Sequence, residues 1–141
     1  MTSEPLPVAR YRSPFAGLRV RLLGLGLDLC LVWLVAAVVA VVTGTRLDSA
    51  RGLLLDVAGA LVYFPVCWGI MGWSLGQHVF GLRVVRAADG NPIGPGAAAM
   101  RAVGCAIAAL PLFVGVLWSG WDSRKQGWQD KFAGTVVIHD R

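Results

Sequence analysis

The sequence predicts an all-α membrane protein: a small bundle of two to three transmembrane helices, with a short cytoplasmic β-hairpin-like insert between the second and third apolar segments. Hydrophobic residues make up 56% of the 141 residues and charged residues only 15%. Soluble domains carry about 25% charged residues, so this balance favours a bilayer as the main partner. The apolar residues gather in three segments, 22–42, 53–75 and 97–121. Each segment is long enough to cross the hydrocarbon core as a helix.

The chain length predicts a single domain. Residues 1–16 are rich in proline and arginine and are expected to form a mobile polar tail. Residues 17–138 are expected to form one transmembrane domain, and 139–141 a second tail. Arginines cluster before the first apolar segment, so the positive-inside rule predicts a cytoplasmic N-terminus. The basic residues form no stripe of the kind that binds nucleic acid, and no nucleic-acid partner is expected.

One carboxylate stands out in the first apolar segment. Asp28 is the only charged residue in 22–42, where a carboxylate costs about 2.5–3.5 kcal/mol at a helix centre. Arg21 opens the segment and lies on nearly the same helix face, about 10 Å away along the axis. Because that separation prevents direct contact, each residue needs a partner elsewhere. Arg101 is the first candidate partner for Asp28, and Arg83 is the second.

Residues 76–96 differ from the apolar segments around them. β-branched residues flank Arg83 and lead into the turn dipeptide Asp89-Gly90. This pattern predicts a short strand and turn, in the form of a cytoplasmic hairpin.

Two arguments conflict over the third apolar segment. Its length permits a full span, which would place the C-terminus outside, and we favour this arrangement. The basic residues of 122–141 instead prefer the cytoplasmic side, which a re-entrant hairpin bent at Pro111 would allow.

No motif indicates enzymatic chemistry. The two histidines, His78 and His139, have no partners at the spacing of metal ligands, so neither a metal site nor a cofactor is expected. The chain also lacks a nucleophile–base constellation, a phosphate loop and a dinucleotide fingerprint. We therefore expect a protein that is not an enzyme.

Four short motifs in order resemble the RDD family of small bacterial membrane proteins. They are the pair Arg21 and Asp28, the segment 76–90, Arg101, and the Asp-Lys-Phe-Ala-Gly-Thr segment that begins at Asp130. Arg19 competes with Arg21 for the family's arginine, and Asp122 competes with Asp130 for its second aspartate. The resemblance implies a multi-pass protein of the bacterial inner membrane.

The resemblance also singles out a charge cluster, Arg21, Asp28, Arg101 and Asp130, whose role has two interpretations. In the first, Asp28 binds or relays a cation, and an oligomer transports a small solute or ion. In the second, the cluster is purely structural, and the protein is an accessory or scaffold subunit of a larger membrane complex. A buried ion pair is weak support for any activity, which favours a structural cluster.

Overall fold

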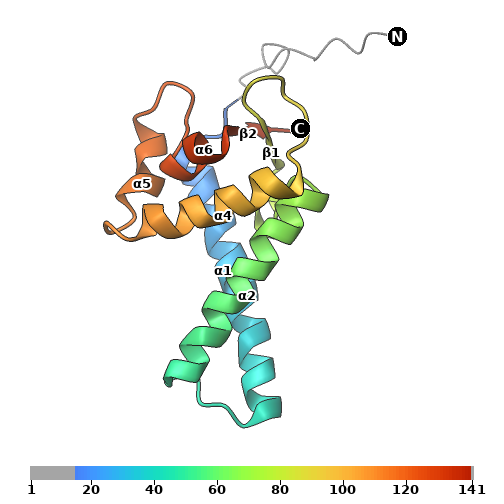
Figure 1. The fold of residues 1–141 in the computed structure, drawn as a ribbon, viewed down its shortest axis with the longest axis vertical. Coiled ribbons are helices and arrows are strands. Elements are labelled where there is room, and N and C mark those ends of the chain that lie inside the picture. The colour runs from blue at the N-terminus through green and yellow to red at the C-terminus, as the bar shows by residue number, and fades with distance from the viewer. Residues whose placement is uncertain (1–14, 141) are drawn as a thin grey trace.

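The structure, a computed structural model, describes residues 15–140 (Figure 1). Two long helices, α1 and α2, run side by side as a pair, and the other elements gather around one end of that pair. We call residues 71–140 the head. The elements are α1 (Leu18–Thr43), α2 (Ala50–Ile70), α3 (Leu75–Val79), β1 (Leu82–Arg86), α4 (Pro95–Ala109), α5 (Val114–Leu117), η2 (Trp118–Gly120), α6 (Trp128–Ala133) and β2 (Thr135–His139).

The first two apolar segments form helices of the predicted kind. Both α1 and α2 are long and apolar enough to cross a membrane. α2 begins at Ser49, whose Oγ accepts a hydrogen bond from the N–H of Gly52 at 3.2 Å and so caps the helix. On α1 the buried residues Val32, Ala36 and Ala40 recur every fourth position. This spacing forms one narrow stripe of small side chains, against which α2 packs closely.

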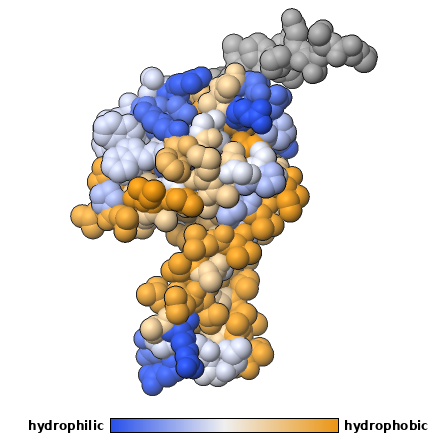
Figure 2. Space-filling model, viewed as in Figure 1, coloured by the Kyte–Doolittle hydropathy of each residue, from blue (hydrophilic) through white to orange (hydrophobic). Residues whose placement is uncertain are grey.

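Most of the surface of the α1–α2 pair is apolar and exposed. Large hydrophobic side chains such as Leu34, Val41 and Leu54 point away from the protein. Figure 2 shows this apolar surface over the pair and over the side of the head nearest to it, with hydrophilic surface at both far ends. Such a band between polar ends is the surface that a bilayer requires of a spanning helix pair.

The third apolar segment does not form one straight helix. α4 ends at Ala109, and the chain turns by 113° before α5. Leu112 and Phe113 have positive φ values of 53° and 61°, and Pro111 lacks the N–H that a continuing helix needs. After the turn the chain returns to pack α6 against α4. The segment 97–121, for which we favoured one span, is therefore a bent pair of helices, a geometry shared by a broken span and a re-entrant loop.

The predicted insert forms its strand and turn, but the strand's main partner lies elsewhere. β1 pairs antiparallel with β2 at the C-terminal end, with Val84 opposite Val137. Within the insert an isolated bridge joins Val85 to Pro92, and the N–H of Arg86 donates to the carbonyl of Asn91 at 2.8 Å. The expected hairpin is thus a two-stranded sheet between segments far apart in the sequence. Local turn signals cannot identify such a distant partner strand.

The sheet also changes the predicted domain boundaries. Phe15 forms a bridge to Ile138, and the N–H of the fully buried Ala16 donates to the carbonyl of Val137 at 2.9 Å. At the other end, the N–H of Asp140 donates to the carbonyl of Gly81 at 2.7 Å. The folded unit is therefore wider than 17–138. The rest of the two predicted tails, residues 1–14 and 141, lies outside the described residues.

The hydrophobic core lies where the sheet meets α2 and α4. Trp68 from α2, Val84 from β1, Ala98 from α4 and Val137 from β2 all belong to one buried cluster. This core therefore packs β2, the last strand of the fold, against β1 and against the N-terminal part of α4.

The return of the chain predicts that both termini lie on one side of the membrane. A fluorescent protein that folds only in the cytoplasm, fused either before residue 1 or after residue 141, should fluoresce in both fusions. The same reporter inserted into the α1–α2 loop at residues 45–47 should stay dark. Fluorescence from only one of the two terminal fusions would contradict the observed fold.

Candidate functional site

A buried carboxylate between two arginines lies at the centre of the head. Asp130 is fully buried, and its two oxygens accept hydrogen bonds from the guanidinium groups of Arg21 and Arg101. The backbone N–H of Gly127 also donates to Asp130 Oδ2 at 2.9 Å. Three donors on two oxygens compensate much of the solvation that a buried carboxylate loses.

Each member of this cluster comes from a different element. Arg21 extends from the first turns of α1, Arg101 from the middle of α4, and Asp130 from α6. α6 approaches α4 closely because residue 104 is glycine: a Cβ there would lie 2.9 Å from the Cα of Gln129. The cluster therefore joins side chains from three helices that lie far apart in the chain.

Further contacts hold the two arginines in position. Arg101 donates to Thr135 Oγ1 at 2.9 Å, and its guanidinium lies 4.6 Å from the centre of the Trp68 ring. Arg21 also donates to the backbone carbonyl of Lys125. A desolvated cation over an aromatic face is stabilised by about 2 kcal/mol. These contacts restrict both side chains to one conformation, as expected of a structural cluster.

Asp28 lies in a separate network without an arginine. Its carboxylate is almost fully buried and accepts hydrogen bonds from Tyr63 Oη at 2.7 Å, from the backbone N–H of Gly76 at 2.7 Å and from Ser74 Oγ. The candidate partner Arg101 binds Asp130 instead. The second candidate, Arg83, lies 3.3 Å from Asp140 at the surface. Both predicted partners of Asp28 are therefore wrong: two hydroxyl groups and a backbone N–H take their place.

The network at Asp28 fastens the α2–α3 connection onto α1. Gly24 and Gly76 are in backbone contact, since a Cβ at residue 76 would lie 2.0 Å from the carbonyl oxygen of Gly24. Glycine at both positions thus allows the backbone of α3 to lie directly against that of α1. Next to it, Gln77 Oε1 accepts from the N–H of Ser74 and from Trp68 Nε1, both at 3.1 Å.

The Asp28 site has three further members that the sequence did not predict: Tyr63, Ser74 and Gln77. Ser74-x-x-Gln77 has the spacing of a capping box, a signal that marks a helix start and a local hydrogen bond. Nothing in that spacing points to an aspartate one helix away. Hydroxyl partners of a buried carboxylate are found only once the helices are packed.

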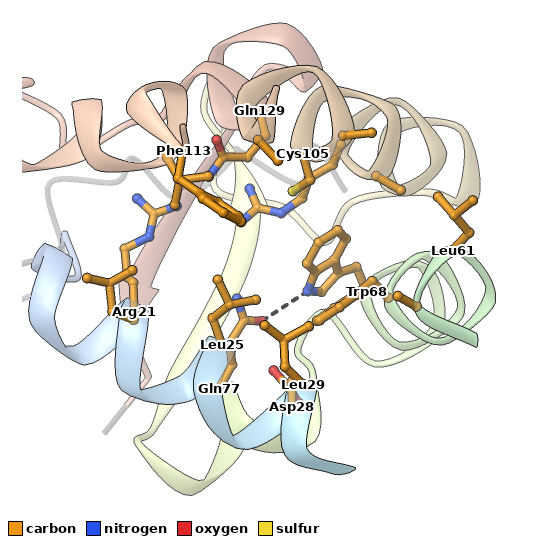
Figure 3. A pocket seen from close by; sticks show the side chains of 18 of the residues that line it. Arg21, Leu25, Asp28, Leu29, Leu61, Trp68, Gln77, Cys105, Phe113 and Gln129 are labelled. Carbon is orange, nitrogen blue, oxygen red and sulfur yellow. Dashed lines mark hydrogen bonds between the residues drawn. The ribbon is translucent and has the colours of Figure 1, made fainter. Parts of the chain in front are cut away.

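A cavity of about 370 Å³ lies between the two networks. Figure 3 shows Arg21 and Gln129 at one part of its wall and Asp28 with Gln77 at another. Most of the remaining wall is apolar and comes from α1, α2, α4 and the α4–α5 turn. It includes Leu25, Leu29, Leu61, Phe64 and Phe113. The cavity is thus an apolar space with polar groups confined to two places.

The structure also separates the competing motif residues. Arg19 is exposed, so Arg21 is the arginine of the buried cluster. Asp122 lies near the surface, 2.7 Å from Lys131 Nζ. The hydrogen bond from Lys131, followed by the one from the N–H of Gln126, lowers the pKa of Asp122 below its usual range. Asp130 is therefore the aspartate that the arginines bind.

Metal-ligating side chains do not gather in the part of the chain that the structure describes. Among residues 15–140, no group of three or more His, Cys, Asp or Glu side chains is placed to hold a metal ion. The two arginines at Asp130 also disfavour a cation at that carboxylate.

These features define a class of protein: a small, mostly helical protein of membrane type, with two long apolar helices and a polar head held by buried charges. The family model of the RDD family matches residues 15–134, most of the chain. The chain belongs to the RDD family.

Curated relatives share part of this sequence. A segment of 70 residues, 50% of the chain, is 37% identical to the Proline-rich antigen homolog of Mycobacterium tuberculosis (strain ATCC 25618 / H37Rv) and covers 29% of that protein. The Proline-rich antigen of Mycobacterium leprae (strain TN) is 34% identical over 70 residues, which is 28% of its length. The match thus spans less than a third of each relative. No solved structure matches the chain.

The buried cluster predicts a large effect of a small substitution. Asp130→Asn removes one negative charge and leaves two buried guanidinium groups uncompensated. We expect the free energy of unfolding in detergent to fall by about 3–5 kcal/mol. The matched control is Asp48→Asn, which removes the partner of Arg46 in an exposed pair and should cost at most about 1 kcal/mol. Equal losses in the two variants would contradict a structural role for Asp130.

Proposed function

We propose that this RDD-family protein is an accessory or scaffold subunit of a larger membrane complex, in which the Arg/Asp cluster is purely structural. The observation that carries the proposal is that both buried carboxylates already have their donors within the chain. Arg21 and Arg101 bind Asp130, while hydroxyl and backbone groups bind Asp28. Groups so fully engaged hold helices together and are poorly placed to exchange ligands.

Two further observations support a subunit role. α1 and α2 bury little of their apolar surface against each other, so they leave wide faces for helices of a partner or for lipid. In the mycobacterial relatives the matching segment is less than a third of the protein, as expected of a membrane module joined to other parts. The proposal places the chain in the bacterial inner membrane with a cytoplasmic N-terminus and no catalytic activity of its own.

Photo-crosslinking tests the subunit proposal directly. A photoreactive residue at the exposed Leu34 should yield one discrete adduct with a different membrane polypeptide in native membranes. The same group at the buried Ala36 is the matched control on the same helix and should give no such adduct. Isolation of a homogeneous homo-oligomer whose only adducts at Leu34 are with itself would overturn the proposal.

The cavity favours a second candidate function, oligomeric transport of a small solute or cation. Asp28 contributes to the cavity wall, and intramembrane carboxylates mark ion paths in many transporters. Two apolar helices cannot enclose a path alone, so several copies would have to assemble around it.

Flux measurements separate this candidate from the first. In vesicles containing the purified chain, Asp28→Asn should abolish flux of the transported ion or solute while leaving the fold intact. The matched control is Asp56→Asn. Asp56 is the other carboxylate in α1 and α2 and lies outside the cavity wall, so this variant should leave the flux unchanged. Absence of wild-type flux across a panel of monovalent cations and small solutes would exclude this function.

A further inference from the structure

The cavity between α1, α2, α4 and α5 has the size and lining of a ligand site. Its volume of about 370 Å³ is within the range of about 300–1,000 Å³ typical of small-molecule pockets. Its wall is mainly aliphatic and aromatic, with few polar groups. A wall of this composition selects a ligand that is mostly hydrocarbon.

The cavity communicates with the surface of the helix pair. Leu29, Leu61 and Phe113 line the cavity and are also 46%, 50% and 55% exposed on the outside of the protein. Figure 2 shows an apolar band over the α1–α2 pair and the adjoining side of the head. In a membrane the neighbours of this band are lipid acyl chains, so an acyl chain is the hydrocarbon with direct access to the cavity.

Two unpaired polar atoms belong to residues that line the cavity at its arginine side. Arg101 Nε, a donor, and Gln129 Oε1, an acceptor, are buried and have no hydrogen-bond partner among residues 15–140. Both residues line the cavity, and both side chains are more than nine-tenths buried. A buried polar atom without a partner costs about 1–3 kcal/mol. A ligand group that both accepts and donates a hydrogen bond would remove both penalties.

The charges of the wall give the ligand its orientation. Two guanidinium groups share the single carboxylate of Asp130, which leaves one positive charge in excess at this side. Asp28 adds a negative charge at another part of the wall. An anionic headgroup is therefore attracted towards the arginines and repelled from Asp28.

We infer that this cavity binds an anionic phospholipid whose headgroup carries a hydroxyl group. One acyl chain occupies the apolar part near Leu61 and Phe113. A phosphate oxygen accepts a hydrogen bond from Arg101 Nε, and the headgroup hydroxyl donates one to Gln129 Oε1. This site goes beyond a subunit or transport role and does not depend on either.

Lipid titration of the purified full-length chain in detergent, followed by native mass spectrometry, tests the inference. Phosphatidylglycerol and phosphatidylcholine with identical acyl chains are the probes, because only the first is anionic and carries a free hydroxyl. We expect phosphatidylglycerol to bind about tenfold more tightly. Equal binding of the two lipids would overturn the inference.

Two variants on the same helix locate the binding. Ala60→Phe fills the cavity from α2, whereas Ala58→Phe places the same ring on an exposed position outside the cavity wall. The first should reduce phosphatidylglycerol binding at least about tenfold and the second should leave it unchanged, with the unfolding midpoint of each variant measured to verify folding. Equal effects of the two substitutions would place the lipid elsewhere.

Two further measurements test the headgroup contacts. Gln129→Leu keeps the side-chain volume similar but removes the acceptor, and should reduce the preference for phosphatidylglycerol about three- to tenfold. Glycerol 3-phosphate, which carries a phosphate and hydroxyl groups but no acyl chains, should not compete at equal concentration. Effective competition by glycerol 3-phosphate would overturn the proposal of a lipid ligand and indicate a soluble solute. An unchanged preference for phosphatidylglycerol in Gln129→Leu would overturn the assignment of the headgroup contacts.

Discussion

The fold of the head depends on the carboxylate of Asp130 between Arg21 and Arg101. Arg21 and Asp130 are 109 residues apart in the chain, yet their contact joins the first helix to the last. Neither arginine could remain buried without this negative charge, because moving an unpaired guanidinium out of water costs several kcal/mol. Asp130 is held within reach of both arginines by its surroundings. The chain returns after α4, α6 packs against α4, and β2 pairs with β1.

Two buried aspartates in one small protein are stabilised in different ways. Asp130 has charged partners and ends up in a cluster with excess positive charge. Asp28 has only neutral donors, which are the Tyr63 and Ser74 hydroxyl groups and the N–H of Gly76. The two networks lie on either side of one apolar cavity, so the cavity has a positive and a negative side. A charge separation of this kind orients an amphiphilic ligand without enclosing a path through the membrane.

Much of the architecture was predictable from the sequence. The spans at α1 and α2 follow from hydropathy, and the family follows from the order of four short motifs. The need of Arg21 and Asp28 for partners follows from the cost of burying a charge. The partner of Asp28 was not predictable, because hydroxyl groups carry no charge signal and Tyr63 lies on another helix. The main strand pairing was also missed, since β2 is separated from β1 by α4, α5 and α6. Pro111 marked the bend of the third segment, although length alone favoured a straight span.

The sequence by itself determined which segments are apolar, which charges need partners and roughly where the two long helices lie. These properties depend on neighbours within a few residues along the chain, and local composition is sufficient to infer them. The tertiary structure alone decided that Arg101 binds Asp130 and not Asp28, that the third segment bends sharply, and that Arg101 and Gln129 line one cavity. Those outcomes depend on contacts between distant segments, where packing and the desolvation of buried charges select one pairing among several that the sequence permits.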